Sequence, residues 1–367
     1  MRKSNSFTRR LFASIIGVGS MSLALIASAN PPEGVLDLTH ASVKAVVAVQ
    51  QDVTPKLMQL PEVLGTAVGL DAAGEPALVI YVDRDARGAA EAERALLAEP
   101  HGVKVQVHLT DKFRAFKGKP GGGGVSHKAK QTLPIQLGTS GSWRKDLANG
   151  YCCGGTLGSL VKINGELHIL SNYHVFESDI VSGGNGTTAE TGDYVTQPGL
   201  IDVNCTAANA QNVGTLVKKS SLPGSNVDCS IAKIISGAVN TNGAILEIGT
   251  ISSQTVAAAL SKAVKKSGRT TGLTRSSISG LNATVSVAYE NECAGGAAFT
   301  KVFTNQIVIA NSGSAFLNSG DSGSLMVEDV ATNPRAVGLL YAGSSTSAIA
   351  NRIDEVLTFL GATMVGN

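Results

Sequence analysis

The chain has 367 residues, a formal net charge of +2 and only 16% charged residues. This length corresponds to about two or three domains and allows at least one large core. The net charge is small and the sequence holds no long basic run, so neither nucleic acid nor an anionic membrane is expected as a partner. Glycine is abundant, and small, β-branched and turn residues are frequent, which favours β structure over helical bundles.

The N-terminus has the pattern of an export signal. Four basic residues precede an apolar stretch at residues 11–27, and Ala27 to Ala29 offer a small-x-small cleavage site. We expect a signal peptide at residues 1–29 and a secreted or periplasmic protein, with a retained anchor as the alternative. Residues 8–12 loosely resemble a twin-arginine signal. No second apolar stretch is long enough to span a bilayer, so no stable membrane insertion is expected after cleavage.

Residues 30–116 predict a small α+β domain. Val43, Val46 and Val47 have helical spacing, which Pro55 interrupts. Two strands, a second helix and a third strand are expected to follow, at residues 63–71, 76–83, 88–99 and 102–109. We expect this segment to be a pro-domain, as in a zymogen, or an accessory domain.

Residues 117–132 predict a linker. They hold four consecutive glycines flanked by Lys and Pro, a composition that neither buries apolar surface nor holds one shape. The segment at residues 133–367 is therefore expected to be a second domain.

This second segment predicts many short strands separated by Gly, Asn and Ser turns. Asn164-Gly165 lies between two apolar-rich runs and is a strong hairpin signal. Further strands are expected at residues 213–219, 229–235, 283–290, 305–310, 324–330 and 336–343, and a closing helix at 350–360. Short strands at this spacing predict β-barrels or a sandwich.

The sequence contains five cysteines, an odd number, so one thiol is left over or pairs between chains. Disulfides are possible in an exported protein. The adjacent Cys152 and Cys153 are not expected to bond each other, and one of them is expected to pair with Cys205. Cys229 is interpreted as a buried small hydrophobe rather than a redox switch. No Cys/His cluster has zinc-finger spacing, so no metal or other cofactor is expected.

Residues 318–327, Asn-Ser-Gly-Asp-Ser-Gly-Ser-Leu-Met-Val, place Ser322 between glycines just before an apolar run. Glycine permits tight turns and close backbone approach, so Ser322 is a candidate nucleophile; a plain Gly/Ser loop is the alternative. A serine hydroxyl needs a base, usually His. His174 follows a predicted hairpin strand and can project into a cleft, whereas His168 lies inside that strand and is expected to pack or to face solvent.

The His base needs an acid to hold its tautomer. Of the aspartates between His174 and Ser322, Asp228 alone directly precedes an apolar strand, while Asp179, Asp193 and Asp202 lie in polar, loop-like sequence. A buried carboxylate requires a partner, and His174 is the obvious one. A solvated Asp at the start of the strand is the alternative.

The order His, Asp, Ser, within SNYHV, VDCSIA and GDSGSL, resembles the chymotrypsin-like (trypsin-fold) serine peptidases over residues 133–360. It is most similar to bacterial secreted members with GTLG, GRTTGLT and GDSGS blocks, here at residues 155–158, 268–274 and 320–324. The resemblance implies a mainly β fold: a double antiparallel β-barrel with a C-terminal helix, preceded here by the small α+β domain.

The resemblance also implies residue roles. His174 would be the general base, Asp228 its orienting acid and Ser322 the nucleophile. The amides of Gly320 and Ser322 would form the oxyanion hole. Substrate-binding residues would be Phe316, Asn318, Tyr341, Ala342 and Gly343.

One departure concerns Asp321, which resembles a buried Asp that pairs with a freed N-terminus in animal enzymes. No Ile-Val-Gly-Gly site precedes the barrels, so another partner is expected. The block at residues 268–274 lacks the ending of a phosphate loop and is interpreted as a loop before a strand.

These features predict an exported serine endopeptidase that acts on a protein or peptide through an acyl-enzyme. The alternatives are a non-catalytic binding protein on a peptidase scaffold and an esterase with the same triad. The sequence makes no prediction of oligomeric state.

Overall fold

The computed structural model describes residues 34–98, 101–115, 127–148, 151–177, 189–289 and 299–367. The predicted signal peptide at residues 1–29 and most of the predicted linker at residues 117–132 lie outside the described residues. From His127 onward the chain is described again, and this side chain is buried between the carbonyl of Gly138 and the carboxylate of Glu247.

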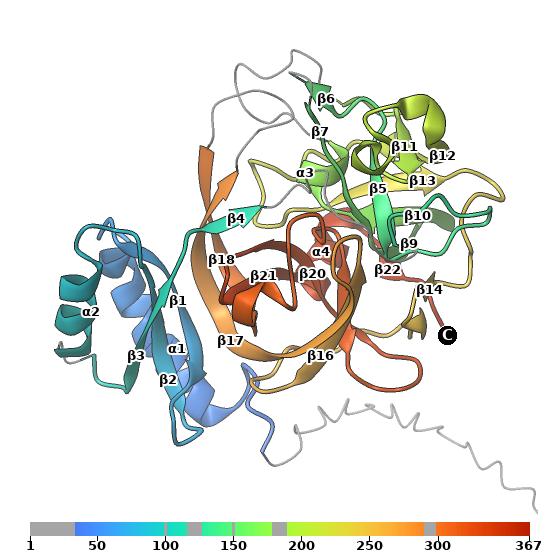
Figure 1. Cartoon of the computed structure of the whole chain (residues 1–367). Helices are drawn as coiled ribbons and strands as arrows, with labels where there is room; N and C mark the ends of the chain where they lie inside the picture. Colours follow the sequence, from blue (N-terminus) through green and yellow to red (C-terminus); the bar gives the residue numbers. More distant parts are fainter. Residues whose placement is uncertain (1–33, 99–100, 116–126, 149–150, 178–188, 290–298) are drawn as a thin grey trace, which may run out of the picture. The chain divides into compact units, whose positions relative to one another are not determined.

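The front segment has the predicted order of helix, strand, strand, helix and strand (Figure 1). Its elements are α1 (Ala41–Leu57), β1 (Val63–Leu70), β2 (Pro76–Asp83), α2 (Ala89–Ala98) and β3 (Val105–Thr110). The predicted interruption at Pro55 is wrong, because α1 continues to Leu57. A proline lacks the amide that bonds to the preceding turn, and in the last turn this loss affects little of the helix.

Strand β1 joins the front segment to a larger sheet. It pairs with β2, antiparallel, and on its other side with β17, where Gly65 lies opposite Val285. A side chain at Gly65 would overlap the carbonyl of Thr284, so glycine allows the two backbones to approach. Strand β3 is parallel to β2, and α2 connects the two.

Six antiparallel strands in the described part of the second segment close into a ring. They are β16 (Ala263–Gly268), β17 (Gly272–Tyr289), β18 (Phe299–Ala310), β19 (Leu325–Glu328), β20 (Ala336–Gly343) and β21 (Ser347–Arg352). The order around the ring is β16-β19-β20-β21-β18-β17, and β17 pairs back onto β16. Strand β17 is longer than the predicted strand at residues 283–290, because register shifts let one strand bend through the sheet.

The second sheet has the order β22-β9-β10-β13-β12-β11-β5-β8 among described residues. Its strands are β5 (Thr139–Trp143), β8 (Gly155–Leu157), β9 (Ser159–Ile163), β10 (Glu166–Ser171), β11 (Tyr194–Gln197), β12 (Gln211–Val217), β13 (Ser230–Ile234) and β22 (Thr363–Met364). Only Gly158 separates β8 from β9, so the sheet curls until its ends meet. The predicted hairpin at Asn164-Gly165 is confirmed, and both residues have positive φ.

Short elements complete the described chain. They are α3 (Tyr173–Phe176), α4 (Ile353–Leu360), η1 (Leu200–Val203), η2 (Ala207–Asn209), η3 (Ser312–Ser314), β4 (Phe113–Ala115), β6 (Leu147–Ala148), β7 (Tyr151–Cys152), β14 (Ala244–Ile245) and β15 (Gly249–Thr250). The predicted mainly β fold is confirmed: two antiparallel barrel-like sheets, a C-terminal helix and a preceding α+β segment.

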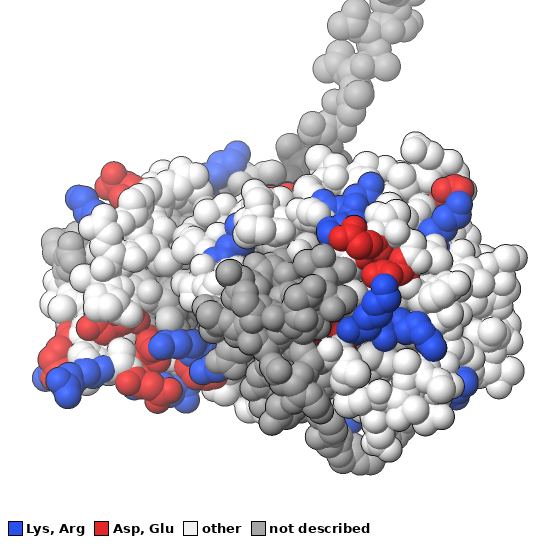
Figure 2. All heavy atoms as spheres, turned by 90° about the horizontal axis from the view of Figure 1, so that it is seen from above, with Lys and Arg blue, Asp and Glu red and all other residues white. Residues whose placement is uncertain are grey.

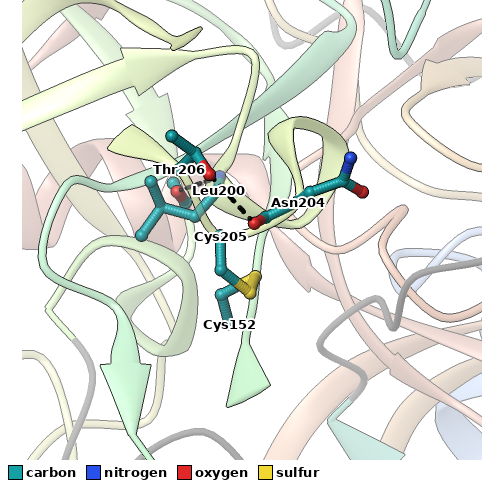
Figure 3. The surroundings of a disulfide bond; sticks show 6 residues. Cys152, Leu200, Asn204, Cys205 and Thr206 are labelled. Carbon is teal, nitrogen blue, oxygen red and sulfur yellow. Dashed lines mark hydrogen bonds between the residues drawn. A yellow bond between two sulfur atoms is a disulfide. The ribbon is translucent and has the colours of Figure 1, made fainter. Parts of the chain in front are cut away.

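A disulfide joins Cys152 to Cys205, beside the end of η1 (Figure 3). The predicted pairing of Cys205 with one of two adjacent cysteines is confirmed, and the partner is Cys152. Cys229 is a buried free thiol, as interpreted from the sequence. Burial raises the pKa of this thiol well above its ordinary value, which keeps it protonated.

Charged side chains of both signs lie close together on the face shown in Figure 2. Where the described residues are visible on this face, the two signs are therefore mixed rather than segregated. No helix in the described parts of the chain is long and apolar enough to cross a membrane.

A buried ion pair connects the two sheets. Arg269, in the turn between β16 and β17, donates two hydrogen bonds of 2.7 Å each to the carboxylate of Asp202 in η1. Ser140 in β5 donates a third, at 2.6 Å. Both charged side chains are at least nine-tenths buried, so each depends on the other for neutralisation.

We predict that Arg269→Met destabilises the protein by about 3–5 kcal/mol, because it leaves the Asp202 carboxylate buried and uncompensated. The double variant Arg269→Met/Asp202→Leu should lose less, and Arg94→Met, which breaks an exposed pair with Glu91, should have little effect. Urea unfolding of the three variants measures this. Equal losses for Arg269→Met and Arg94→Met would contradict the role of the buried pair.

Candidate active site

His174 lies in α3, the single turn that follows β10, and is only 5% exposed. Glu177 ends this turn, and its buried carboxylate accepts hydrogen bonds from the amides of Lys219 and Ser220 and from the hydroxyl of Ser230. These bonds attach the turn to residues 219–230 of the same chain and so hold His174 in position. Burial raises the pKa of Glu177, which the three hydrogen bonds partly oppose.

Asp228 immediately precedes β13 and is fully buried. Its Oδ2 accepts a hydrogen bond from Nδ1 of His174 at 2.6 Å, and its Oδ1 accepts one from the amide of Tyr173 at 2.7 Å. This geometry places the proton of a neutral His174 on Nδ1 and leaves Nε2 as the acceptor. Nε2 is buried and has no hydrogen-bond partner among the described residues.

The main chain of Asp228 is held on both sides as well. Its carbonyl accepts from the Asn172 side chain at 2.7 Å, and its amide donates to Asn351 Oδ1 at 2.9 Å. Asn351 in turn donates to Gln306 at 2.6 Å. Residues of β18 and β21 therefore position an aspartate that belongs to the other sheet.

The other candidate acids have different partners. Asp193 accepts hydrogen bonds from the Trp143 indole and from Lys145. Asp202 binds Arg269, as described above, and Asp179 lies outside the described residues. His168 is buried in β10 and donates to the carbonyl of Glu166.

Ser322 lies in a tight turn before β19, where Gly320 and Gly323 have φ of 94° and 93°. A side chain at Gly323 would overlap Ser171 and the carbonyl of Thr156, so glycine is required there for both space and conformation. The carbonyl of Ser322 accepts the amide of Thr156 at 2.8 Å. The turn that carries Ser322 is thereby fastened to the sheet that carries His174.

The hydroxyl of Ser322 donates to the carbonyl of Tyr341 at 3.2 Å rather than to His174. The two regions are nonetheless neighbours, because a methyl group placed on Gly155 would contact both Val175, next to His174, and the carbonyl of Ser322. Within the described chain, the amides of Gly320 and Ser322 donate to no backbone or side-chain acceptor. Both remain available to bind an oxyanion.

Asp321 has the alternative partner that the sequence led us to expect. Its carboxylate accepts from the amides of Thr270 and Thr271 and lies 3.4 Å from the ammonium of Lys266. Lys266 also donates to Thr271 Oγ1 and to the carbonyl of Gly272. Burial lowers the pKa of Lys266, an effect that the charge of Asp321 opposes. The turn at residues 269–271 therefore supplies hydrogen-bond donors to the Asp321 carboxylate, which occupies these donors in place of a phosphate.

The predicted substrate-binding residues lie on two segments. Phe316 is buried in an apolar cluster, its carbonyl accepts the hydroxyl of Thr274, and the amide of Asn318 donates to Asp321. Tyr341, Ala342 and Gly343 form the end of β20. The described residues contain no cluster of three or more His, Cys, Asp or Glu side chains that could hold a metal ion.

The end of β20 is paired with residues of the front segment. In β4, Ala115 lies opposite Ala342 and Arg114 lies opposite Gly343, in antiparallel register. The same short strand pairs in parallel with the end of β17, where Ala115 lies opposite Tyr289. Strand β4 thus pairs with both β17 and β20, and Figure 1 shows it beside the end of β17.

Two contacts of this site were not predicted from the sequence. Tyr289 donates its hydroxyl to Asp228 Oδ2 at 2.9 Å, and Asn351 binds the Asp228 amide. Each lies more than 60 residues from Asp228. No local sequence signal relates them to it.

Comparison with known proteins gives a partial family match and several similar structures. The model of the Nal1 C-terminal domain matches residues 210–353. Thermobifida fusca protease A is 20% identical with a TM-score of 0.41, and the match covers 64% of this chain and 99% of that one. A glutamic-acid-specific serine protease is 17% identical with a TM-score of 0.41, covering 63% of this chain and 100% of that one. Nocardiopsis protease is 15% identical with a TM-score of 0.41, covering 63% of this chain and 98% of that one.

No curated protein matches the chain. Identities this low assign no role to any residue, so the function is argued from the chain's own side chains.

Proposed function

We propose that this protein is an exported serine endopeptidase in which Ser322, His174 and Asp228 form the catalytic triad. The observation that carries the proposal is the buried 2.6 Å bond between His174 Nδ1 and Asp228, which leaves His174 Nε2 free as a base. The turn of Ser322 lies against the same region and has two unpaired amides among the described residues. Such a set matches the requirements of acyl transfer.

In the proposed mechanism, rotation of the Ser322 side chain from Tyr341 toward His174 starts the reaction. Ser322 Oγ attacks the peptide carbonyl while His174 Nε2 takes its proton, and Asp228 stabilises the imidazolium that forms. The amides of Gly320 and Ser322 stabilise the oxyanion. His174 then protonates the leaving amine. Water attacks the acyl-enzyme while His174 takes a proton from it, and His174 returns that proton to Ser322 Oγ as the acid product leaves.

We predict that Ser322→Ala or His174→Ala lowers turnover of a peptide substrate by several orders of magnitude, because the triad acts as a unit. Asp228→Asn should cost about 10⁴-fold, since it disturbs the tautomer of His174. Steady-state kinetics on the purified variants measures both. A silent Asp228→Asn, with another aspartate essential, would show that the acid is misassigned.

An esterase or a non-catalytic binding protein are the competing functions. An esterase would hydrolyse simple esters and leave matched amides intact, because amides have the poorer leaving group. A binding protein would hydrolyse neither. The two unpaired amides and the free Nε2 favour a catalytic role over binding alone.

The front segment, residues 30–116, is proposed to be a pro-domain. It would block the end of β20, where the substrate backbone is proposed to pair, until the chain is cut near residues 117–132. Strand β4 supports this role, because Arg114 and Ala115 pair with Gly343 and Ala342, the residues proposed to bind the substrate backbone. A second attachment supports it as well, since Asp111 accepts hydrogen bonds from the amide and hydroxyl of Ser345.

We predict that secreted protein begins near Asn30 in one form and near the segment at residues 117–132 in an active, shorter form; mass spectrometry of intact protein measures this. In the uncut chain, Arg114→Pro should raise the initial rate of peptide hydrolysis, because proline removes an amide from the paired strand. Arg114→Ala, which keeps that amide, is the matched control. A single, fully active species that retains Asn30 would reduce the segment to an accessory domain.

Substrate preference is proposed to favour small or apolar side chains before the cleaved bond. Two segments are proposed to form the walls of the pocket for that side chain, residues 311–320 and 341–345. Neither segment contains an Asp or a Glu. Phe316 and Leu317 on the first wall are buried and apolar. Once the front segment and its Asp111, which binds Ser345, have been removed, an Arg or Lys side chain entering there would lack a counter-charge, which is strongly disfavoured.

We therefore predict that a peptide library is cut mainly after uncharged residues, as read by sequencing of the products. Dominant cleavage after Arg or Lys would contradict this. It would point to Glu290 or Glu292, which lie outside the described residues.

A further inference from the structure

Tyr289 ends β17 and contacts both His174 and Asp228 of the candidate triad. Its hydroxyl donates to Asp228 Oδ2 at 2.9 Å, the same oxygen that accepts His174 Nδ1 at 2.6 Å. Its ring meets the His174 ring edge-on at 6.0 Å between centroids and stacks on Phe299 at 4.8 Å. The side chain is only 4% exposed, so this contact is shielded from water.

The direction of the hydrogen bond follows from the environment of Tyr289. Burial, and then the negative charge of Asp228, raise the pKa of the Tyr289 phenol well above its ordinary value. The phenol therefore keeps its proton at neutral pH. Since an ionised carboxylate has no proton to give, Tyr289 is the donor and Asp228 the acceptor.

We propose that Tyr289 is a positioning residue of the reaction, one that holds the Asp228 carboxylate in the plane of His174 and limits how strongly it attracts the imidazolium proton. This inference rests on the proposed serine peptidase function. It assigns a role in that chemistry to a residue of β17, a strand that carries no member of the triad.

Two anchors fix the orientation of the carboxylate. The amide of Tyr173 binds Oδ1 and the hydroxyl of Tyr289 binds Oδ2, so rotation about the Asp228 side chain breaks at least one bond. Without the hydroxyl, Oδ2 would accept from His174 alone among the described residues. Holding a base in the geometry that the reaction needs lowers the activation free energy, because the base need not be oriented during the reaction.

The second effect is electrostatic. A donor on Oδ2 partly neutralises the carboxylate charge, so its removal leaves more charge facing His174 and stabilises the protonated ring. The acid limb of the activity profile should then move to higher pH. Among the described residues, the other titratable groups near this pair include Tyr341 from β20, Cys229 beside Asp228, Glu177 at the end of α3 and Tyr173 next to His174, and Tyr289→Phe leaves each of these side chains in place.

The test compares Tyr289→Phe with Tyr194→Phe, since each variant removes one phenolic oxygen from a tyrosine that remains in the proposed active, shorter form. Tyr194 lies in β11 and is 47% exposed, and among the described residues its hydroxyl forms no hydrogen bond. We expect Tyr289→Phe to lower kcat by about 10-fold with KM little changed, as for loss of a hydrogen bond to a charged group. The acid limb of its pH profile should shift upward, and the control should match wild type in both respects.

A second readout does not depend on turnover. In full-length Ser322→Ala protein labelled with ¹⁵N-histidine, NMR follows the titration of His174 with Tyr289 or Phe at position 289. The midpoint should lie at higher pH in Tyr289→Phe. A midpoint and pH profile identical to those of the Tyr194→Phe control would overturn the proposal. Absence of peptide hydrolysis in wild type would instead defeat the proposed function, and the titration would still report whether Tyr289 acts on His174 through Asp228.

Discussion

The buried carboxylate of Asp228 is the constraint on which the candidate site depends. An ionised group without exposed surface is tolerated only where donors surround it. Here the donors are the His174 ring, the Tyr173 amide and the Tyr289 hydroxyl. They come from α3, which follows β10 of one sheet, and from β17 of the other, so both sheets must be assembled before the carboxylate is satisfied.

A second buried carboxylate, Asp321, holds the turn that carries Ser322, because it binds the amide of Asn318 in that turn and the amides of the turn between β16 and β17. The turn between β16 and β17 supplies two of its amide donors, and Lys266 supplies the neutralising charge. The same turn carries Arg269, which pairs with Asp202 in the other half of the molecule. One turn therefore fastens the serine loop and also joins the two sheets. In this arrangement Asp321 is neutralised by a side chain of the chain itself and needs no freed N-terminus.

Local sequence signals predicted the parts of the site that depend on neighbouring residues. An aspartate directly before an apolar strand indicated Asp228, and glycines around Ser322 indicated a tight turn; the structure places both accordingly. Asn164-Gly165 predicted its hairpin because only a few residue types favour positive φ at both positions. By contrast, Tyr289 and Lys266 reach their partners through strand register: β17 shifts its register against β18 between Ile278 and Val285, and Lys266 of β16 lies opposite Thr274 of β17. The pairing of β1 with β17 and of β4 with β20 depends on contacts between segments distant in sequence, which periodicity does not encode.

The central claim is that Ser322 is a nucleophile activated by His174. Its most direct test is to treat the purified protein with a fluorophosphonate probe and to identify the modified residue by mass spectrometry. The account predicts one adduct, on Ser322, that forms in wild type and is lost in His174→Ala. An unlabelled Ser322 in a preparation that hydrolyses peptides, or an adduct on a different serine, would contradict it.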